Sequence, residues 1–209
     1  MRFASENGMA GLSFRVAEII RKDTGVSWYG ALYPHPQFKV DYDIDEALVW
    51  AISRQESGFN PRAKSSAKAA GLMQLMPATA SFIARDRGYR GRKRHQLFEP
   101  ELNLKLGQNY IQHLLDEPLV ESSLIRLLAA YNGGPGNLRK WLGKVDHQDD
   151  PFLLVESMPA RETRYYVKNV ISNLGIYRQR FGETTPALSG LAAGNGGKFV
   201  PSEAIDKDL

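Results

Sequence analysis

The carboxylate of Glu56 is the first candidate for chemistry in this sequence. It follows apolar residues that recur at the three- and four-residue spacing of one helix face: Ile44, Ala47, Leu48, Ala51 and Ile52. Because Glu56 lies four residues beyond Ile52, it continues this apolar face. A carboxylate there is costly unless it is paired or its pKa is raised, and a raised pKa suits a general acid working near neutral pH. The alternative is a helix-end Glu that turns toward water.

A second carboxylate, Glu162, stands four residues before Tyr166 at the start of another apolar series. Two turns rich in Gly, Pro and Asn, residues 71–77 and 132–137, lie at expected helix junctions. Acids, amides, a tyrosine and exposed backbone at helix ends would give a groove many hydrogen-bonding groups. Such a groove suits carbohydrate, which presents hydroxyls and apolar ring faces. The alternative for Glu162 is an acid favoured at a helix N-terminus.

The spacing of apolar residues and helix-boundary residues predicts an almost entirely helical chain. No alternating pattern typical of a strand is found, so the expected fold class is all-α. One helix is expected to follow the acidic segment 41–45 and to end at the break at 60–61. A short helix is expected to resume after the turn at 132–137 and to end at 141. The other helices are expected over about residues 12–22, 77–87, 99–117, 122–131, 151–157 and 160–181.

We expect three parts along the 209 residues, a length sufficient for one domain with a buried core plus tails. Residues 1–40 are read as an N-terminal helix and connector, and residues 41–182 as the catalytic domain. Residues 183–209 shift to Thr, Pro, Gly, Ala and Ser, which predicts a flexible C-terminal tail. No apolar run reaches the length of a membrane span, and no signal peptide is visible in this chain.

Composition excludes several kinds of site. The chain has no cysteine, so thiol nucleophiles, disulfides and Cys-based metal sites are ruled out. The histidines show no paired metal-ligand spacing, so neither a metal nor a cofactor is expected: His35, His95, His113 and His147. The net charge of +4 comes from one segment, residues 85–94, with six basic residues and one acidic residue. We read this segment as a solvated loop; contact with an anionic polymer or lipid is the alternative, and nucleic-acid binding is not expected.

Four motifs, taken in order, resemble those of the lytic transglycosylases, in particular the catalytic domain of the soluble lytic transglycosylases of bacterial cell-wall turnover. They are Arg54-Gln55-Glu56-Ser57, Gly71-Leu72-Met73-Gln74-Leu75-Met76-Pro77, Ala130-Tyr131-Asn132-Gly133-Gly134-Pro135-Gly136, and the stretch from Glu156-Ser157-Met158-Pro159 to Glu162-Thr163-Arg164-Tyr165-Tyr166-Val167. The similarity covers about residues 40–182. Gly133 stands where many members carry Ala, a difference that we expect to be neutral.

The resemblance implies a lysozyme-like helical domain, of the goose-type-lysozyme kind, with a saccharide-binding cleft. It implies cleavage of the β-1,4 bond between N-acetylmuramic acid and N-acetylglucosamine in peptidoglycan, without hydrolysis, leaving 1,6-anhydromuramic acid ends. The partner would be the glycan strand, with or without its stem peptide, and the place the periplasm or cell envelope. We expect a monomer.

The same resemblance suggests a role for each candidate residue. Glu56 would be the general acid and then the base. Substrate-binding residues would be Ser57, Met73, Gln74, Tyr131, Asn132, Glu162 and Tyr166. Alternatives remain open: helix capping for Ser57, core packing for Met73 and Tyr131, and a helix-end acid for Glu162.

One physical feature agrees with a single catalytic carboxylate. A glycosidase with two carboxylates needs a second Asp or Glu across the sugar, and no acidic residue occurs between Ser57 and Arg85. Two rivals remain. A goose-type or other lysozyme would hydrolyse the same bond, and a non-catalytic domain would bind peptidoglycan without cleaving it.

Overall fold

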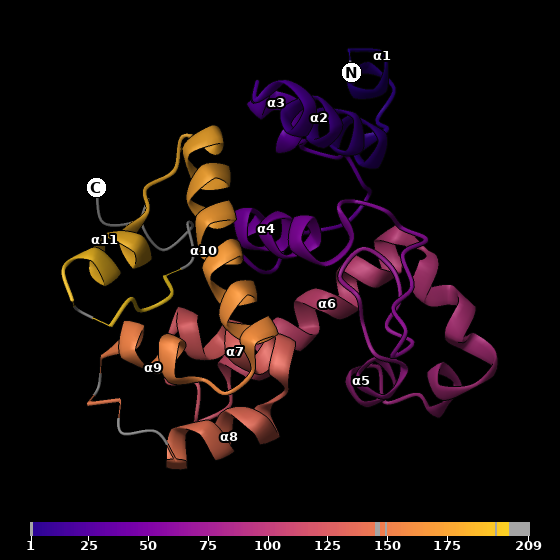
Figure 1. The fold of residues 1–209 in the computed structure, drawn as a ribbon. Coiled ribbons are helices and arrows are strands. Elements are labelled where there is room, and N and C mark those ends of the chain that lie inside the picture. Colours follow the sequence, from indigo (N-terminus) through magenta and orange to yellow (C-terminus); the bar gives the residue numbers. More distant parts are fainter. Residues whose placement is uncertain (1, 145–146, 149, 195, 201–209) are drawn as a thin grey trace. The chain divides into compact units, whose positions relative to one another are not determined.

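The computed structural model describes residues 2–144, 147–148, 150–194 and 196–200. Within these ranges the regular structure is helical, and β-pairing is confined to isolated bridges, so the all-α prediction is confirmed (Figure 1). The α-helices are α1 (Arg2–Glu6), α2 (Ala10–Thr24), α3 (Tyr29–Leu32), α4 (Glu46–Ser57), α5 (Pro77–Ile83), α6 (Pro100–Leu115), α7 (Leu124–Gly133), α8 (Pro135–Lys144), α9 (Pro151–Ser157), α10 (Arg161–Phe181) and α11 (Pro186–Ala192), and the 3-10 helices are η1 (Arg87–Arg90) and η2 (Arg92–Phe98).

The chain divides into two compact units, each built from two stretches of sequence. Unit 1 comprises Met1–Tyr42 and Ile52–Asn109, and unit 2 comprises Asp43–Ala51 and Tyr110–Leu209. Helices α4 and α6 therefore contribute residues to both units. This division does not follow the linear boundaries expected at residues 40 and 182.

Unit 1 is held together around the loop that carries the second motif. Residues 64–75 form two isolated antiparallel bridges, Lys64 to Ala70 and Ala70 to Leu75. Helix α5 starts at Pro77, where proline's fixed φ suits a first helical turn, and it packs against η1. Helix α2 packs against α1 and α3.

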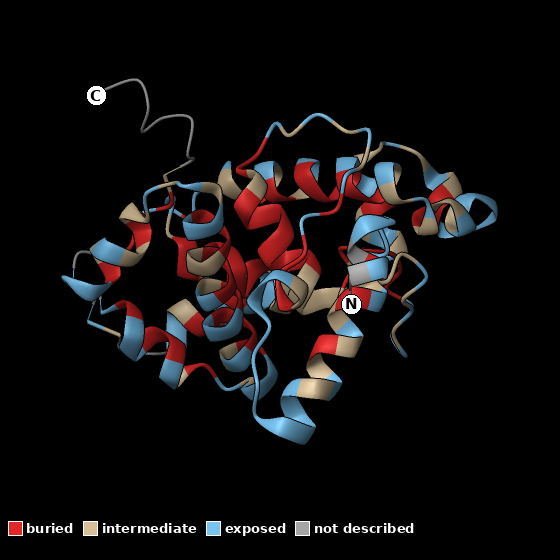
Figure 2. Cartoon of the chain, turned by 90° about the horizontal axis from the view of Figure 1, so that it is seen from above, coloured by how far each residue is buried: buried red, intermediate tan, exposed pale blue. Residues whose placement is uncertain are grey.

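Unit 2 is organised around α7, which packs against α8 and α10. Seven of the eight positions from Leu124 to Tyr131 are buried, and they lie on all sides of the helix: Leu124, Ile125, Leu127, Leu128, Ala129, Ala130 and Tyr131. The longer helix α10 shows the alternation of a surface helix, with one buried face and one exposed face (Figure 2).

The start of α4 is fixed by Asp45. Its Oδ1 accepts a hydrogen bond of 3.0 Å from the backbone nitrogen of Leu48, which satisfies one of the otherwise unpaired N–H groups of the first turn. Its Oδ2 is paired with Arg178 of α10, and both side chains are almost completely buried. The acidic segment expected to begin this helix thus supplies the cap, and the same residue joins α4 to α10 within unit 2.

Two expectations about loops are wrong. The helix that begins at Pro77 ends at Ile83 and not near Arg87, and the basic segment 85–94 is not a plain loop, because it contains η1 and the start of η2. Asp86 explains the start of η1, since its Oδ1 accepts from Gly88 N at 2.7 Å and its Oδ2 pairs with Lys93 Nζ at 2.7 Å. These bonds hold the pKa of the Asp86 carboxyl below its usual value.

Part of the segment expected to be a flexible tail is packed in unit 2, namely residues 183–194 and 196–200. Within this range α11 buries Ala187 and Leu191, and Phe199 is buried as well. Arg178 donates to the carbonyl oxygens of Thr184 at 3.3 Å and Val200 at 2.6 Å. The segment is therefore packed in unit 2, while residues 201–209 and part of the expected polar loop at 146–150 lie outside the described residues.

Candidate functional site

Glu56 lies in the last turn of α4. The apolar face that precedes it is buried as expected: Ile44, Ala47, Leu48, Ala51 and Ile52 are all at most 8% exposed. Glu56 itself is partly exposed. A carboxyl at the edge of an apolar face and still open to solvent can exchange protons with a ligand, which is what an acid and base catalyst must do.

Ser57, the next residue, uses its hydroxyl within the helix. Its Oγ donates a hydrogen bond of 3.1 Å to the backbone oxygen of Ser53, one turn earlier. This is a common local bond for serine in helices. This bond agrees with the alternative role of Ser57, a structural one at the helix end. A contact between Ser57 and the substrate stays a prediction.

The second motif is held by a residue that the sequence did not single out. Asn103 of α6 is completely buried, and its side chain bonds to three backbone groups of unit 1. Its Oδ1 accepts from Met73 N at 2.8 Å, and its Nδ2 donates to Ala70 O at 3.0 Å and Leu97 O at 2.9 Å. One side chain therefore fixes the shape of the motif loop.

Met73 and Gln74 occupy different environments in that loop. The Met73 side chain has no exposed surface and lies against Gly107 of α6, so a ligand can reach it only after a rearrangement, and packing is the role that its burial supports. Gln74 is partly exposed and has a positive φ of 47°. Its Nε2 donates to Ala63 O at 3.0 Å and to Gly71 O at 2.9 Å, so the amide braces the loop from within.

The third and fourth motifs meet in unit 2. Tyr131 of α7 is 9% exposed and stacks on Tyr166 of α10, with ring centroids 6.5 Å apart and nearly parallel planes. Asn132 is partly exposed, and its Oδ1 accepts from Thr163 Oγ1 at 2.7 Å. The structure thus brings three predicted residues to the junction of two helices: Tyr131, Asn132 and Tyr166.

Glu162 stands at the start of α10, before the apolar series that contains Tyr166. It lies in the first turn of α10 and is exposed. Negative charge there interacts favourably with the helix dipole. This position agrees with the alternative role of Glu162, an acid that stabilises a helix N-terminus. Recognition of a stem peptide by Glu162 stays a prediction.

Tyr110 extends this aromatic row, with its ring centroid 5.3 Å from that of Tyr131. Burial raises the pKa of Tyr110 to about 12. Since the folded pKa is above the ordinary value of 10.0, the resulting contribution to stability is complete below about pH 10 and is lost as pH rises toward about 12. We expect the urea midpoint to fall more steeply over this range in the wild type than in Tyr110→Phe. Equal slopes would contradict the assignment.

Gly133 offers a second test of this region, and its close packing argues against the neutral change expected there. A Cβ at Gly133 would lie 2.5 Å from Cη2 of Trp141, a side chain that is 8% exposed. We expect Gly133→Ala to lower the free energy of unfolding by about 1–3 kcal/mol through overpacking.

The matched control is Gly136→Ala, where an added Cβ meets nothing within 4 Å; it should be neutral or slightly stabilising. A double-mutant cycle with Trp141→Phe should show favourable coupling to Gly133→Ala, because the smaller ring relieves the contact. Urea denaturation of the four proteins measures this. Independent, additive effects would mean that Trp141 is not the obstacle.

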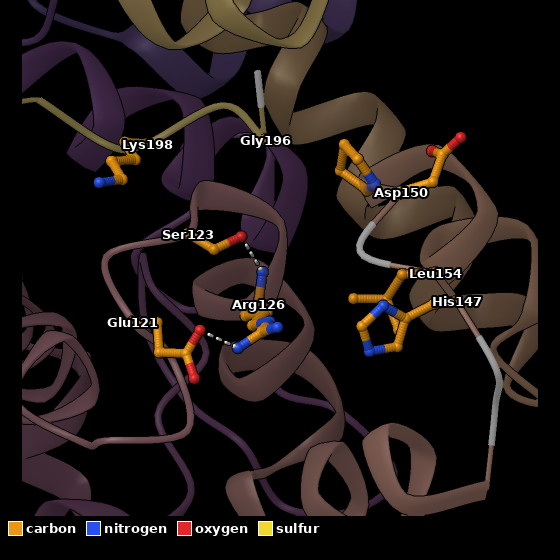
Figure 3. A pocket seen from close by; sticks show the side chains of 9 residues that line it. Glu121, Ser123, Arg126, His147, Asp150, Leu154, Gly196 and Lys198 are labelled. Carbon is orange, nitrogen blue, oxygen red and sulfur yellow. Dashed lines mark hydrogen bonds and ion pairs between the residues drawn. The ribbon is translucent and has the colours of Figure 1, made fainter. Parts of the chain in front are cut away.

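A cavity of about 200 Å³ in unit 2 contains none of the predicted residues (Figure 3). Four of its polar side chains have structural partners: Arg126 Nη1 pairs with Glu121 Oε2 at 2.7 Å, Ser123 Oγ accepts from Arg126 N, and Asp150 caps α9. We assign this cavity no function. Among the described residues no group of three or more His, Asp or Glu side chains is placed to hold a metal ion, and no helix is long and apolar enough to cross a membrane.

Comparison with known proteins decides the family. Residues 37–152, more than half of the chain, match the family described as Transglycosylase SLT domain. This chain belongs to that family. The soluble lytic murein transglycosylase of Salmonella typhimurium is 41% identical over 150 residues, which cover 70% of this chain and 23% of that protein. The SLT-domain chain thus spans about a quarter of the length of this relative.

Two solved structures are similar to this SLT-domain chain. The 70 kDa soluble lytic transglycosylase SLT70 of Escherichia coli matches with a TM-score of 0.74 and 34% identity, over 87% of this chain and 30% of that one. An inactive Glu-to-Gln mutant of the lytic transglycosylase Slt of Pseudomonas aeruginosa matches with a TM-score of 0.58 and 37% identity, over 66% of this chain and 22% of that one. The fold is therefore the lysozyme-like helical fold that the motifs implied.

Proposed function

We propose that this chain is the catalytic part of a lytic murein transglycosylase that cleaves the β-1,4 bond between N-acetylmuramic acid and N-acetylglucosamine in peptidoglycan. The observation that carries the proposal is the position of Glu56. It ends a buried helix face, lies within the part of the chain that matches the SLT domain, and keeps part of its surface open to solvent. The inactivity of the Pseudomonas aeruginosa relative with a Glu-to-Gln change supports an essential glutamate in this family.

Proton transfer by one carboxyl can complete the reaction. Glu56 donates its proton to the oxygen that leaves with N-acetylglucosamine as the bond from that oxygen to C1 of the muramic sugar breaks. The carbonyl oxygen of the substrate's own N-acetyl group stabilises the developing positive charge at C1, as in substrate-assisted glycosidases. The Glu56 carboxylate then removes the proton of the muramic 6-hydroxyl, and the oxygen of that hydroxyl bonds to C1. The 1,6-anhydro ring closes, Glu56 is again protonated, and no water is consumed.

Three carboxylates close to Glu56 in the sequence already have structural partners, which supports a mechanism that uses a single carboxyl. Asp86, the first acidic residue after Glu56, is bonded to Lys93 and to the backbone of Gly88. Asp45 is paired with Arg178, and Glu46 accepts from the indole nitrogen of Trp50 at 3.0 Å. A hydrolytic glycosidase would need one of its carboxylates available to activate water.

Substrate contacts are proposed for the partly exposed polar residues of the motifs. The side-chain oxygen of Asn132 accepts from Thr163, and its amide nitrogen can donate to a ligand. The side-chain nitrogen of Gln74 donates within the loop, and its side-chain oxygen can accept from a ligand. Tyr131 and Tyr166 stack on each other and are only 9% and 4% exposed, so contact of their rings with an apolar sugar face is proposed from the family resemblance alone. Because its substrate is peptidoglycan, we place the protein in the cell envelope, on the periplasmic side, acting as a monomer in wall turnover or remodelling.

The proposal is tested by incubating the protein with purified sacculi and identifying the released muropeptides by mass. We expect 1,6-anhydromuramic ends, which are lighter than reducing ends by one water molecule. Reducing ends would make the chain a lysozyme-type hydrolase. Binding to sacculi without any release would make it a non-catalytic peptidoglycan-binding domain.

A further inference from the structure

The N-terminal helix α2 packs directly against the turn that follows Glu56. An added Cβ at Gly11 would lie 2.8 Å from the carbonyl oxygen of Phe59, and one at Gly58 would lie 2.7 Å from Cε1 of Phe14. The rings of Phe14 and Phe59 meet edge to face, with centroids 5.8 Å apart. Such close approach leaves the turn little room to move relative to α2.

That turn has an unusual backbone. Gly58 and Phe59 both have positive φ, 55° and 63°, and a large side chain such as Phe adopts this region only when its surroundings hold it there. Phe59 is 3% exposed. The end of α4 is therefore shaped by what packs on it, and α2 supplies part of that packing.

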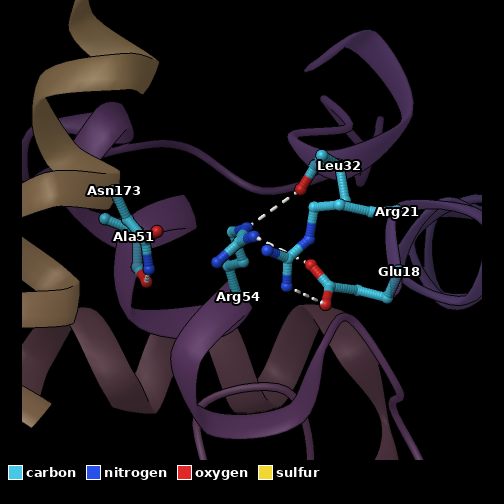
Figure 4. A network of polar contacts seen from close by, with 6 residues as sticks. All are labelled: Glu18, Arg21, Leu32, Ala51, Arg54 and Asn173. Atoms are coloured by element: carbon cyan, nitrogen blue, oxygen red, sulfur yellow. Dashed lines mark hydrogen bonds and ion pairs between the residues drawn. The ribbon is translucent and has the colours of Figure 1, made fainter. Parts of the chain in front are cut away.

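The side chain of Arg54 links the last turn of α4 to the N-terminal segment (Figure 4). Its Nε donates to Leu32 O at 2.9 Å, and its guanidinium lies 4.2 Å from the ring centroid of Tyr33 and 4.9 Å from that of Phe14. Its Nη2 is 3.6 Å from Glu18 Oε1. The side chain is only 15% exposed, so these contacts are poorly screened by water.

These contacts need an arginine. A planar guanidinium can cover aromatic rings with its faces and donate from its edge at the same time, whereas a lysine ammonium offers one compact charge. Arg54 precedes Glu56 by two residues, and its own carbonyl oxygen accepts from Gly58 N at 3.1 Å. A shift of Arg54 would therefore move the backbone on both sides of Glu56.

We propose that Arg54 is a positioning residue: through Leu32, Tyr33, Phe14 and Glu18 it fixes the last turn of α4, so that these four residues belong to the apparatus that orients Glu56. The catalytic part of this inference rests on the proposed function. The structural part does not, because it concerns the order of one helical turn.

The test uses the full chain and three variants: Arg54→Ala, Arg54→Lys and, as matched control, Arg21→Ala. Arg21 bonds to Glu18 at 2.8 Å and lies on α2, so its removal weakens the same N-terminal cluster without touching α4 directly. Amide hydrogen exchange at residues 55–60 reports on the turn. Steady-state turnover of soluble glycan strands, below the melting temperature of each protein, reports on catalysis.

We expect Arg54→Ala to speed exchange at residues 55–60 and to lower kcat by about 10- to 100-fold with little change in KM, because small misplacement of a catalytic group is costly. Arg54→Lys should recover only part of the loss, and Arg21→Ala should resemble the wild type. Unchanged exchange in Arg54→Ala, faster exchange with normal kcat, or an equal loss in Arg21→Ala would each overturn the proposal. If Arg54→Ala does not fold, Arg54→Lys decides by the same readouts.

Failure of the proposed function looks different, since the wild type itself would then release no product. That result would remove the catalytic meaning of Arg54. Exchange at residues 55–60 would still show whether Arg54 fixes the turn.

Discussion

Glu56→Gln should lose at least about 10³-fold in the release of muropeptides from sacculi, because both proton transfers depend on this carboxyl and general acid or base catalysis contributes about 10²–10⁴-fold. Glutamine has nearly the same shape but neither donates an acidic proton nor accepts one. Binding to sacculi should therefore be kept, and a sedimentation assay measures it beside the activity.

The matched control is Glu162→Gln, the same chemical change at the exposed first turn of α10. We expect its catalytic rate to stay within about tenfold of the wild type, since Glu162 is not given a proton-transfer role. Substantial activity in Glu56→Gln, or equal losses in the two variants, would remove Glu56 from the centre of the mechanism.

Asn103→Ala should be among the most destabilising single changes in unit 1. It would remove the side-chain partner of three buried backbone groups: Met73 N–H, Leu97 C=O and Ala70 C=O. Ala70 C=O keeps a second bond, from Leu75 N at 3.0 Å, so the main cost falls on the other two groups. At about 1–3 kcal/mol for each buried group left unsatisfied, we expect a loss on the order of 4 kcal/mol in the free energy of unfolding. That is a large part of the stability of an ordinary domain.

Asn109→Ala is the control for this prediction, because Asn109 lies on the same helix and is exposed. Its effect should be within about 0.5 kcal/mol. Guanidinium denaturation of the wild type and both variants gives the comparison. An Asn103→Ala protein as stable as the control would show that Asn103 does not fix the second-motif loop.

The position of Glu56 at the end of a buried helix face was predictable from the spacing of apolar residues. Five apolar residues before it share one helix face, and that face is buried in the structure. The helix start was predictable for a similar reason, since an acidic residue before an apolar series is a local signal. Only the structure shows that this residue, Asp45, also pairs with Arg178, which is 133 positions further along the chain.

Asn103 was missed because nothing local distinguishes it. The buried positions of α6 include Asn103 beside the apolar residues Leu104, Leu106, Ile111 and Leu114. A buried amide is recognised by its partners, and these come from residues 70–73 and 97. Spacing within one helix carries no information about them.

Gly133 and the C-terminal segment show two ways in which the structure adds to local patterns. We expect Gly133 to be sensitive because of Trp141, a packing contact between two helices that motif comparison does not reveal. In contrast, α11 did have a local signal: Pro186 at its first position, and the buried Ala187 and Leu191 four residues apart. The overall Thr, Pro, Gly and Ser content of the segment outweighed that signal in the prediction.

The central claim is that Glu56 closes the muramic 6-hydroxyl onto C1 and that no water takes part. Digestion of sacculi in water enriched in heavy oxygen, followed by mass analysis of the new glycan ends, tests it most directly. We expect anhydro ends that carry no heavy oxygen, and no new ends with Glu56→Gln. New reducing ends labelled at C1 would contradict it, because the label can enter only if water attacks that carbon.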